Sequence, residues 1–286
     1  MNTLSKKRVA LLYHPLVDES QVLARELVAI VEACGYEAWL ESAWAKKEVV
    51  SQASSCGLLV TLGGDGTILR IARAALESNL ALQHTPPLLT IDFGTLGFLT
   101  ELSPAEARES LRRVLAGNFW LEERRLLQAT LVRDGQVVEQ RLALNDVVLA
   151  RGDGPHAIRL SLFIDDAETA RYTADAMIIA SPTGSTAYAL AAGGPILGPD
   201  MAGMLAVPVA PHLALARSFV VPSTSRITLN ASVYKKTVVT LDGQITLAYE
   251  TNDLLHVEQS DSVARFVRLG PRNYFYATLQ EKLKRA

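Results

Sequence analysis

Short apolar runs alternate with segments of helical period over the first hundred residues, and this alternation limits the possible folds more than any other feature. Residues 8–13 (RVALLY), 57–62 (GLLVTL) and 87–93 (PLLTIDF) are apolar enough to be buried strands. The stretches 21–35 and 68–78 have apolar residues at helical spacing. Because buried strands that alternate with helices form parallel sheets, the sequence predicts an α/β domain with a doubly wound parallel sheet.

A helix with a capping box follows this α/β region. Ser103 is placed as the N-cap, Pro104 as the first helical residue and Glu106 as the third, and Gly117 ends the helix. We place the domain boundary at the start of this helix, so the α/β domain is expected to cover residues 1–102.

The remainder of the chain has the texture of a β-rich domain. Residues 103–270 contain alternating apolar runs and turn dipeptides, which predict a β-sandwich-like domain. The last segment, 271–286, has apolar residues at helical spacing and is expected to pack back on the first domain. The strand and turn signals are residues 158–164, residues 227–230, Asp134-Gly135 and Asp242-Gly243.

Composition excludes several classes of function. The 286 residues are 49% hydrophobic and 20% charged, with a net charge of -2, so no basic field favours nucleic acid as a partner. Cys34 and Cys56 match no metal-ligand spacing, and no signal peptide is evident, which favours a cytoplasmic protein. The uncharged window 176–199 is interrupted by Pro182 and Gly184, and we expect no membrane span.

A glycine-rich loop lies where a predicted strand meets a predicted helix. Gly63-Gly64-Asp65-Gly66-Thr67 can bring backbone N–H groups close to phosphate, and the helix dipole favours an anion there. The loop is neither GxGxxG nor a Walker A loop. A carboxylate among these glycines is typical of phosphoryl transfer, although a tight turn with Asp65 capping the helix would explain the loop equally well.

Two further segments have unusual polarity. Residues 181–188 (SPTGSTAY) contain small and hydroxylated residues between a predicted strand and an Ala-rich helix, where capping and packing could also explain them. Asn145-Asp146 interrupts an apolar stretch, as the polarity of an edge strand also could.

In combination, these segments resemble the bacterial and archaeal NAD kinase family in order and spacing, over most of the chain. The SPTGSTAY run is specific to that family, whereas GGDG is shared with lipid kinases and phosphofructokinases. The segments that carry the resemblance are GGDGT at 63–67, IDFGTLGFL at 91–99, Asn145-Asp146, SPTGSTAYALAAGGPI at 181–196, Pro211-His212 with Arg217, and Asp242-Gly243-Gln244.

The resemblance implies transfer of the γ-phosphoryl group of ATP to the 2′-hydroxyl of the adenosine ribose of NAD, with Mg²⁺ or another divalent cation. It makes Asp65 the catalytic base and Arg70 a contact to the dinucleotide. It also implies a homodimer or homotetramer whose second subunit completes the NAD site. The other loop residues assigned to nucleotide binding are Gly63, Gly64, Gly66 and Thr67.

The same resemblance implies an NAD site. Asn145 and Thr186 match residues that hold adenine and its ribose, Tyr188 offers a stacking face, Phe98 an apolar wall, and Asp175 a contact to the nicotinamide side. The further residues assigned to this site are Asp146, His156, Ala187, Ala189, Leu190, Ala191, Asp242 and Gln244. His156 could instead be structural.

Several positions depart from the family pattern, and two other functions stay open. Asp92 replaces Asn and Thr173 replaces Arg, which affects how phosphates and nicotinamide would be held. One alternative is a GGDG kinase that acts on a lipid or a sugar. The other is a nucleotide-binding regulator without catalysis. The remaining departures are Thr90, Ala176, Ala191 and Ser218.

Overall fold

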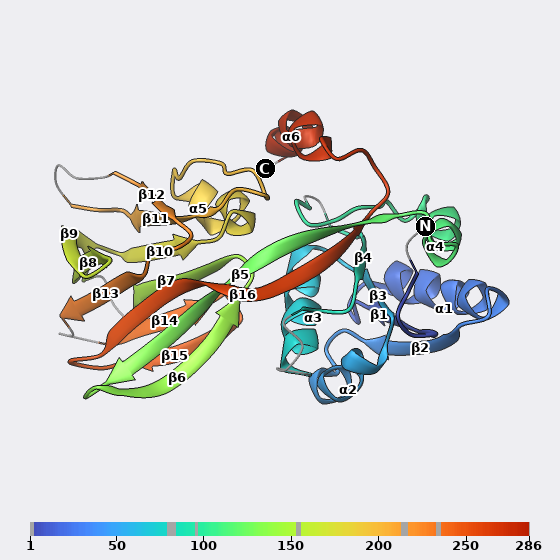
Figure 1. Cartoon of the computed structure of the whole chain (residues 1–286), viewed down its shortest axis with the longest axis horizontal. Helices are drawn as coiled ribbons and strands as arrows, with labels where there is room; N and C mark the ends of the chain where they lie inside the picture. Colours follow the sequence, from blue (N-terminus) through green and yellow to red (C-terminus); the bar gives the residue numbers. More distant parts are fainter. Residues whose placement is uncertain are drawn as a thin grey trace. The chain divides into compact units, whose positions relative to one another are not determined.

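The computed structural model describes residues 3–78, 84–94, 97–152, 156–212, 217–232 and 236–285. The chain forms two compact units, coloured along the sequence in Figure 1: Met1–Arg124 with Ser262–Ala286, and Arg125–Asp261. The long strands β5 (Trp120–Arg133) and β16 (Leu254–Arg268) each contribute residues to both. The division at 102 and 270 expected from the sequence stays a prediction.

The first unit is built on a parallel sheet in the order β2-β1-β3-β4, which confirms the predicted α/β fold. The end of β16 lies parallel to β4 through the pair Phe266 and Leu88. β3 is buried at every residue, as expected of a parallel strand covered on both faces. The strands are β1 (Arg8–Tyr13), β2 (Glu37–Ser42), β3 (Leu58–Leu62) and β4 (Leu88–Ile91).

Helices cover this sheet on both sides. α1 packs with α4, and α2 packs with α3; in Figure 1, α3 lies on the side of the sheet opposite to α1 and α4. Leu27 of α1 and Leu111 of α4 share one apolar cluster with Val60 of β3. The helices are α1 (Asp18–Ala33), α2 (Lys46–Gln52), η1 (Ala53–Ser55), α3 (Asp65–Glu77) and α4 (Ala107–Leu115).

The structure corrects one predicted element. α4 begins at Ala107, so Ser103 is not its N-cap. Half of the expected capping box is present, since the Ser103 N–H donates to Glu106 Oε2 at 2.9 Å, but the Ser103 hydroxyl donates to the same oxygen and does not accept the Glu106 N–H. Residues 104–106 form a turn before the helix, since the Glu106 N–H donates to the Ser103 carbonyl, three residues back, at 3.2 Å. Gly117 has φ +84° and ends the helix as expected.

The second unit consists of two antiparallel layers, which confirms the β-rich, sandwich-like prediction. One layer is a sheet in the order β12-β11-β10-β7-β14-β15. Leu127, Leu160 and Leu229 of the other layer pack against Leu149, Met177 and Val239 of this sheet. The strands are β6 (Gln136–Ala143), β7 (Asp146–Arg151), β8 (Ile158–Ile164), β9 (Ala167–Ala174), β10 (Ala176–Ala180), β11 (Gly203–Val209), β12 (Phe219–Pro222), β13 (Ile227–Ser232), β14 (Thr237–Leu241) and β15 (Ile245–Tyr249).

Both predicted hairpin turns are present. Asp134 and Gly135 have φ +49° and +77° between β5 and β6, and Asp242 and Gly243 have φ +51° and +62° between β14 and β15. Positive φ at both central residues matches the twist of the flanking strands. Two short helices, η2 (Thr183–Thr186) and α5 (Tyr188–Ala191), follow β10. None of the described helices is long and apolar enough to cross a membrane.

A buried ionic cluster holds the C-terminal part of the first unit. Arg268 is 1% exposed and pairs with Glu101 at 3.0 Å and Glu122 at 2.9 Å. Arg124 pairs with the same Glu122 at 3.0 Å. Tyr274, the first residue of α6 (Tyr274–Arg285), donates its hydroxyl to Glu122 and accepts from Arg124. The start of α6 is therefore tied to β5, to β16 and to the loop after β4.

We expect Arg268→Met to lower the free energy of unfolding by about 3 to 5 kcal/mol, because Glu101 would stay buried without its ion-pair partner and Glu122 would keep only Arg124 as a cation. Chemical denaturation without ligand measures this loss. Arg265→Met is the control, since that arginine of the same strand pairs with Glu123 at the surface, where the two side chains are 29% and 53% exposed; its loss should stay below about 1 kcal/mol. Equal losses would refute the assignment of the cluster.

Candidate functional site

The GGDGT loop makes the predicted connection from β3 to the N-terminus of α3. Gly64 is the N-cap, and its carbonyl accepts the N–H of Thr67 at 2.9 Å. A Cβ on Gly63 would lie 2.4 Å from Thr67 Oγ1, so packing requires glycine there. A Cβ on Gly66 would meet nothing within 4 Å. The glycine at 66 therefore leaves open space beside the helix N-terminus, where a ligand can approach the backbone.

Asp65 is fixed by the loop that follows β4. Its carboxylate accepts the N–H of Phe98 at 2.9 Å and the N–H of Leu99 at 3.2 Å. Burial raises the pKa of this carboxyl, the two amides lower it, and the charges of Lys282 and Asp92 act in opposite directions. The result is a half-buried carboxylate with a raised pKa, which is a better proton acceptor than an ordinary aspartate.

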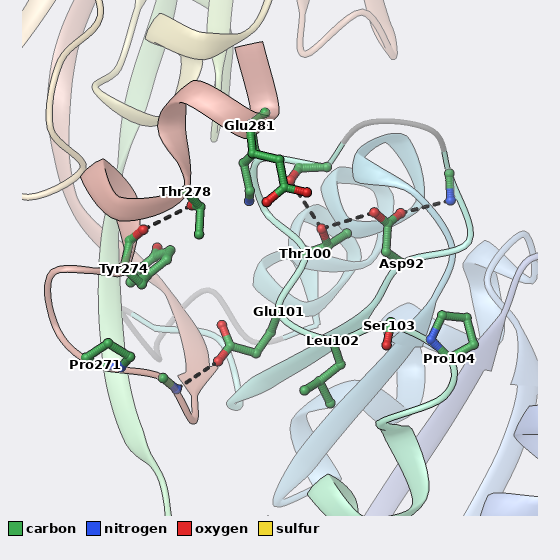
Figure 2. Close-up of a pocket in the computed structure, with 14 residues that line it drawn as sticks. Asp92, Thr100, Glu101, Leu102, Ser103, Pro104, Pro271, Tyr274, Thr278 and Glu281 are labelled. Carbon is green, nitrogen blue, oxygen red and sulfur yellow. Dashed lines mark hydrogen bonds between the residues drawn. The ribbon is translucent and has the colours of Figure 1, made fainter. Parts of the chain in front are cut away.

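A cavity of about 550 Å³ lies between this loop and α6 within the first unit. Figure 2 shows Asp92 and Thr100 on one wall and Glu281 on the other. Asp92 accepts the N–H of Gly94 at 2.8 Å and the hydroxyl of Thr100 at 3.4 Å. Asp92, one of the residues that depart from the family pattern, therefore lines the cavity and also holds the conformation of the loop after β4.

Arg70 lies in an aromatic cluster that the sequence did not reveal. Its guanidinium carbon lies 4.6 Å from the centroid of the Trp44 ring. The centroids of the Trp44 and His14 rings are 4.3 Å apart in a T-shaped arrangement. His14 and Trp44 come just after β1 and β2, at the same sheet edge as the GGDGT loop. A cation on this platform is oriented for an anionic or planar ligand.

In the second unit, Asp242 fixes the Asn145-Asp146 segment. Its carboxylate accepts the N–H groups of Leu144, Asn145 and Asp146 at 2.9, 2.7 and 3.1 Å. Asp146 pairs with Ala180 in the register of β7 and β10. Asn145, Ser181 and Asp242 therefore lie together at one end of the six-stranded sheet. Gln244 follows Asp242 in the hairpin that leads to β15.

The SPTGSTAY run packs tightly on this segment. The Ser181 N–H donates to the Asn145 carbonyl at 2.9 Å, and a Cβ on Gly184 would lie 2.0 Å from that oxygen. Asn145 is buried, and its Oδ1 atom has no hydrogen-bond partner among the described residues. Tyr188 is 46% exposed. The remaining predicted residues of this run, Thr186, Ala187, Ala189, Leu190 and Ala191, are in η2, in α5 or between them.

Asp175 lies at the other end of the six-stranded sheet, and His156 lies next to strands β8 and β9 of the other layer. Asp175 precedes β10, so it is about 20 Å from Ser181 along the strand. Its carboxylate pairs with Arg151 at 3.1 Å. His156 is exposed just before β8, whose first residue pairs with Ala174. The structure therefore does not bring these two residues together with Asn145 within one chain.

Two family models match this chain, one over the segment that contains the GGDGT loop and one over the segment that contains Asn145 and the SPTGSTAY run. Residues 37–119 match the model of the ATP-NAD kinase N-terminal domain, and residues 144–269 match that of the ATP-NAD kinase C-terminal domain. The chain belongs to the NAD kinase family.

Relatives in this family are similar over nearly their whole length. An NAD kinase of Dehalococcoides mccartyi is 39% identical over 97% of this chain and 96% of its own. An NAD kinase of Chloroflexus aggregans is 37% identical over 98% and 99%. The family assignment also favours an NAD kinase over the alternative of a lipid or sugar kinase.

Solved structures of the family have the same fold. Yeast NADH kinase complexed with NADH aligns with a TM-score of 0.83 and 25% identity, over 98% of this chain and 88% of that one. An Archaeoglobus fulgidus NAD kinase in complex with ATP aligns with a TM-score of 0.80 and 24% identity, over 98% and 99%. Within the described residues, no group of three or more His, Cys, Asp or Glu side chains is placed to hold a metal ion.

This NAD kinase family member should show a pH-dependent stability that originates at Asp146. Burial, and then repulsion from Asp242, raises the pKa of the Asp146 carboxyl to about 7. In the unfolded chain, the pKa of an aspartate carboxyl is about 4. The folded form therefore keeps this proton between about pH 4 and 7, and the stability that it contributes is lost as the pH rises through that window.

We expect Asp146→Asn to remove this dependence. Between pH 5 and pH 8, the wild-type protein should lose about 2 to 3 kcal/mol more unfolding free energy than the variant does. Denaturant unfolding without ligand at both pH values measures this difference. Asp200→Asn, which changes an exposed carboxylate of the same unit, should behave like the wild type. A pH dependence that survives in Asp146→Asn would show that another group is responsible.

Proposed function

We propose that this chain is an ATP-dependent NAD kinase, which transfers the γ-phosphoryl group of ATP to the 2′-hydroxyl of the adenosine ribose of NAD and yields NADP and ADP. The observation that carries the proposal is Asp65. It is a half-buried carboxylate held by two backbone amides at the start of α3, in the GGDGT loop of an NAD kinase family member. We expect the protein to act in the cytoplasm on these small-molecule substrates.

In the proposed reaction, Asp65 orients the ribose hydroxyl and accepts its proton. The hydroxyl oxygen forms a bond to the γ-phosphorus, and the bond from that phosphorus to the β,γ-bridging oxygen breaks, so ADP leaves with the electron pair. The raised pKa of Asp65 favours proton transfer near neutral pH. The amides of Phe98 and Leu99 keep the carboxylate in one orientation, which limits the cost of positioning.

A divalent cation, Mg²⁺ in our proposal, would be bound mainly by the phosphate oxygens of ATP, since Mg²⁺ usually takes one or two carboxylates beside substrate phosphates. When bound, it neutralises charge on the phosphates. Asp92 fits this cation because its carboxylate lines the cavity and its negative charge repels that of Asp65. With Asp92 as the ligand, Asp65 keeps its oxygens for the ribose hydroxyl.

The second unit is proposed to recognise NAD. The unpartnered Oδ1 atom of Asn145 can accept a hydrogen bond from the exocyclic amine of adenine. The exposed ring of Tyr188 offers a stacking face, and Thr186 offers a hydroxyl. Asp175 is too far along β10 to serve the same nucleoside, so we propose a homodimer or homotetramer in which it serves the nicotinamide side of a second copy's site.

One assay tests this function. Purified protein is incubated with NAD, ATP and Mg²⁺, and NADP is detected with an NADP-specific dehydrogenase. Formation of NADP, with one ADP for each NADP, supports the proposal. NAD binding without any NADP would instead favour a nucleotide-binding regulator, and ATP-dependent phosphorylation of a lipid or sugar but not of NAD would favour another GGDG kinase.

Asp65→Asn should lower kcat about a hundredfold or more, because the amide keeps the shape but cannot accept a proton. NAD affinity, measured by calorimetry, should change little. Asp18→Asn is a matched control, since Asp18 is an exposed acidic residue in the first turn of α1, and its kcat should equal that of the wild type. Wild-type turnover in Asp65→Asn would exclude Asp65 as the base.

Asp175→Ala should raise KM for NAD about tenfold or more while KM for ATP barely changes, because a charge-assisted contact contributes about 1.5 to 3 kcal/mol. The melting temperature without ligand should stay nearly constant, since the pair with Arg151 is half-exposed. Glu168→Ala is the control, because its carboxylate is 35% exposed in a similar pair, against 34% for Asp175. A lowered melting temperature with unaltered kinetics would assign Asp175 a structural role.

A further inference from the structure

The C-terminal helix brings a lysine to the carboxylate loop. Lys282 lies on the last turns of α6, and its ammonium is 5.6 Å from the centroid of the Phe98 ring. Phe98 is the residue whose N–H donates to Asp65. Lys282 also lines the cavity of Figure 2 together with Asp92. A cation from the end of the sequence is thus placed beside the proposed catalytic base.

Charges of both signs surround Lys282. Asp65 and Asp92 attract it from the first unit's loops, while Arg268 of β16 and Arg124 of β5 repel it. Burial, together with these arginines, lowers the pKa of its ammonium. No carboxylate in the described part of the chain forms an ion pair or hydrogen bond with it. A half-buried ammonium in this position is costly unless an anion joins it.

Lys282 is held in place from the other end of its helix. The Tyr274 hydroxyl is bonded to Glu122 at 2.9 Å, and the Tyr274 carbonyl accepts the hydroxyl of Thr278 at 3.0 Å. Tyr274 and Lys282 are about two helical turns apart, so the ionic cluster of Arg268 sets where Lys282 can reach. The same Arg268 pairs with Glu101 in the loop that holds Asp65.

We propose that Lys282 binds a non-bridging oxygen of the phosphoryl group that ATP transfers, so that the C-terminal helix completes the transfer site. This inference rests on the proposed function. The charge of the transferred group spreads over three equatorial oxygens in the transition state. A fixed cation on the cavity that Asp92 also lines, close enough to act on the charge of Asp65, would meet the group as it approaches the hydroxyl that Asp65 orients.

Three variants test the role of Lys282. Lys282→Met keeps the apolar stem but removes the charge, Lys282→Arg keeps the charge, and Lys284→Met removes an exposed charge from the same helix. We expect Lys282→Met to lower kcat/KM for ATP about a hundredfold, the loss typical of one transition-state donor, with KM for NAD within about twofold. Lys282→Arg should recover at least part of the loss, and Lys284→Met should match the wild type.

A second measurement does not depend on turnover. Calorimetry with inorganic tripolyphosphate should show about tenfold weaker binding to Lys282→Met than to Lys284→Met. Equal kcat/KM and equal tripolyphosphate affinity in these two variants would overturn the proposal. So would equal losses in Lys282→Met and Lys282→Arg with a lowered melting temperature, which would show a packing role. Wild-type protein that forms no NADP would overturn the proposed function, and this proposal with it.

Discussion

The arrangement of the first unit depends on the two hydrogen bonds that the Asp65 carboxylate accepts from the amides of Phe98 and Leu99. They join the N-terminus of α3 to the loop after β4, so a residue of the GGDGT motif is fixed by a segment more than thirty positions away. The loop is itself held because Arg268 contacts the Leu99 carbonyl and pairs with Glu101. A buried cation therefore stabilises the orientation of a carboxylate that it does not touch.

The second unit uses the same device for a different purpose. Asp242 accepts the N–H groups of three consecutive residues and so fixes the backbone at Asn145, whose buried Oδ1 atom has no hydrogen-bond partner among the described residues. Burial of the Asp146 carboxyl, and then repulsion from the neighbouring Asp242, raises the pKa of Asp146 to about 7. A carboxylate that accepts backbone N–H groups can thus fix the conformation of a proposed binding segment, while its negative charge contributes to the raised pKa of a neighbouring carboxyl.

The features that sequence predicted are those with a local physical cause. Fully apolar strands such as β3, the glycines of the GGDGT loop and the hairpin at Asp242-Gly243 each follow from burial or from backbone conformation. β2 was missed because its sequence, EAWLES, is half polar at the sheet edge. The stack of Arg70 on Trp44 and the approach of Lys282 to Phe98 were missed because the partners are remote in sequence. A lysine near the end of an amphipathic helix is usually interpreted as a solvated charge.

The charges around Asp65 explain why the site tolerates Asp92 in place of the amide that the family pattern favours. In the free protein, Asp92 raises the pKa of Asp65 and Lys282 lowers it, so the two effects oppose each other. An arriving phosphate and its cation would bind to the same two groups. The cation would neutralise the charge of Asp92, and the phosphate would neutralise the charge of Lys282. Since both influences on Asp65 weaken together, the carboxylate would keep its affinity for a proton while the strongly charged substrate binds beside it.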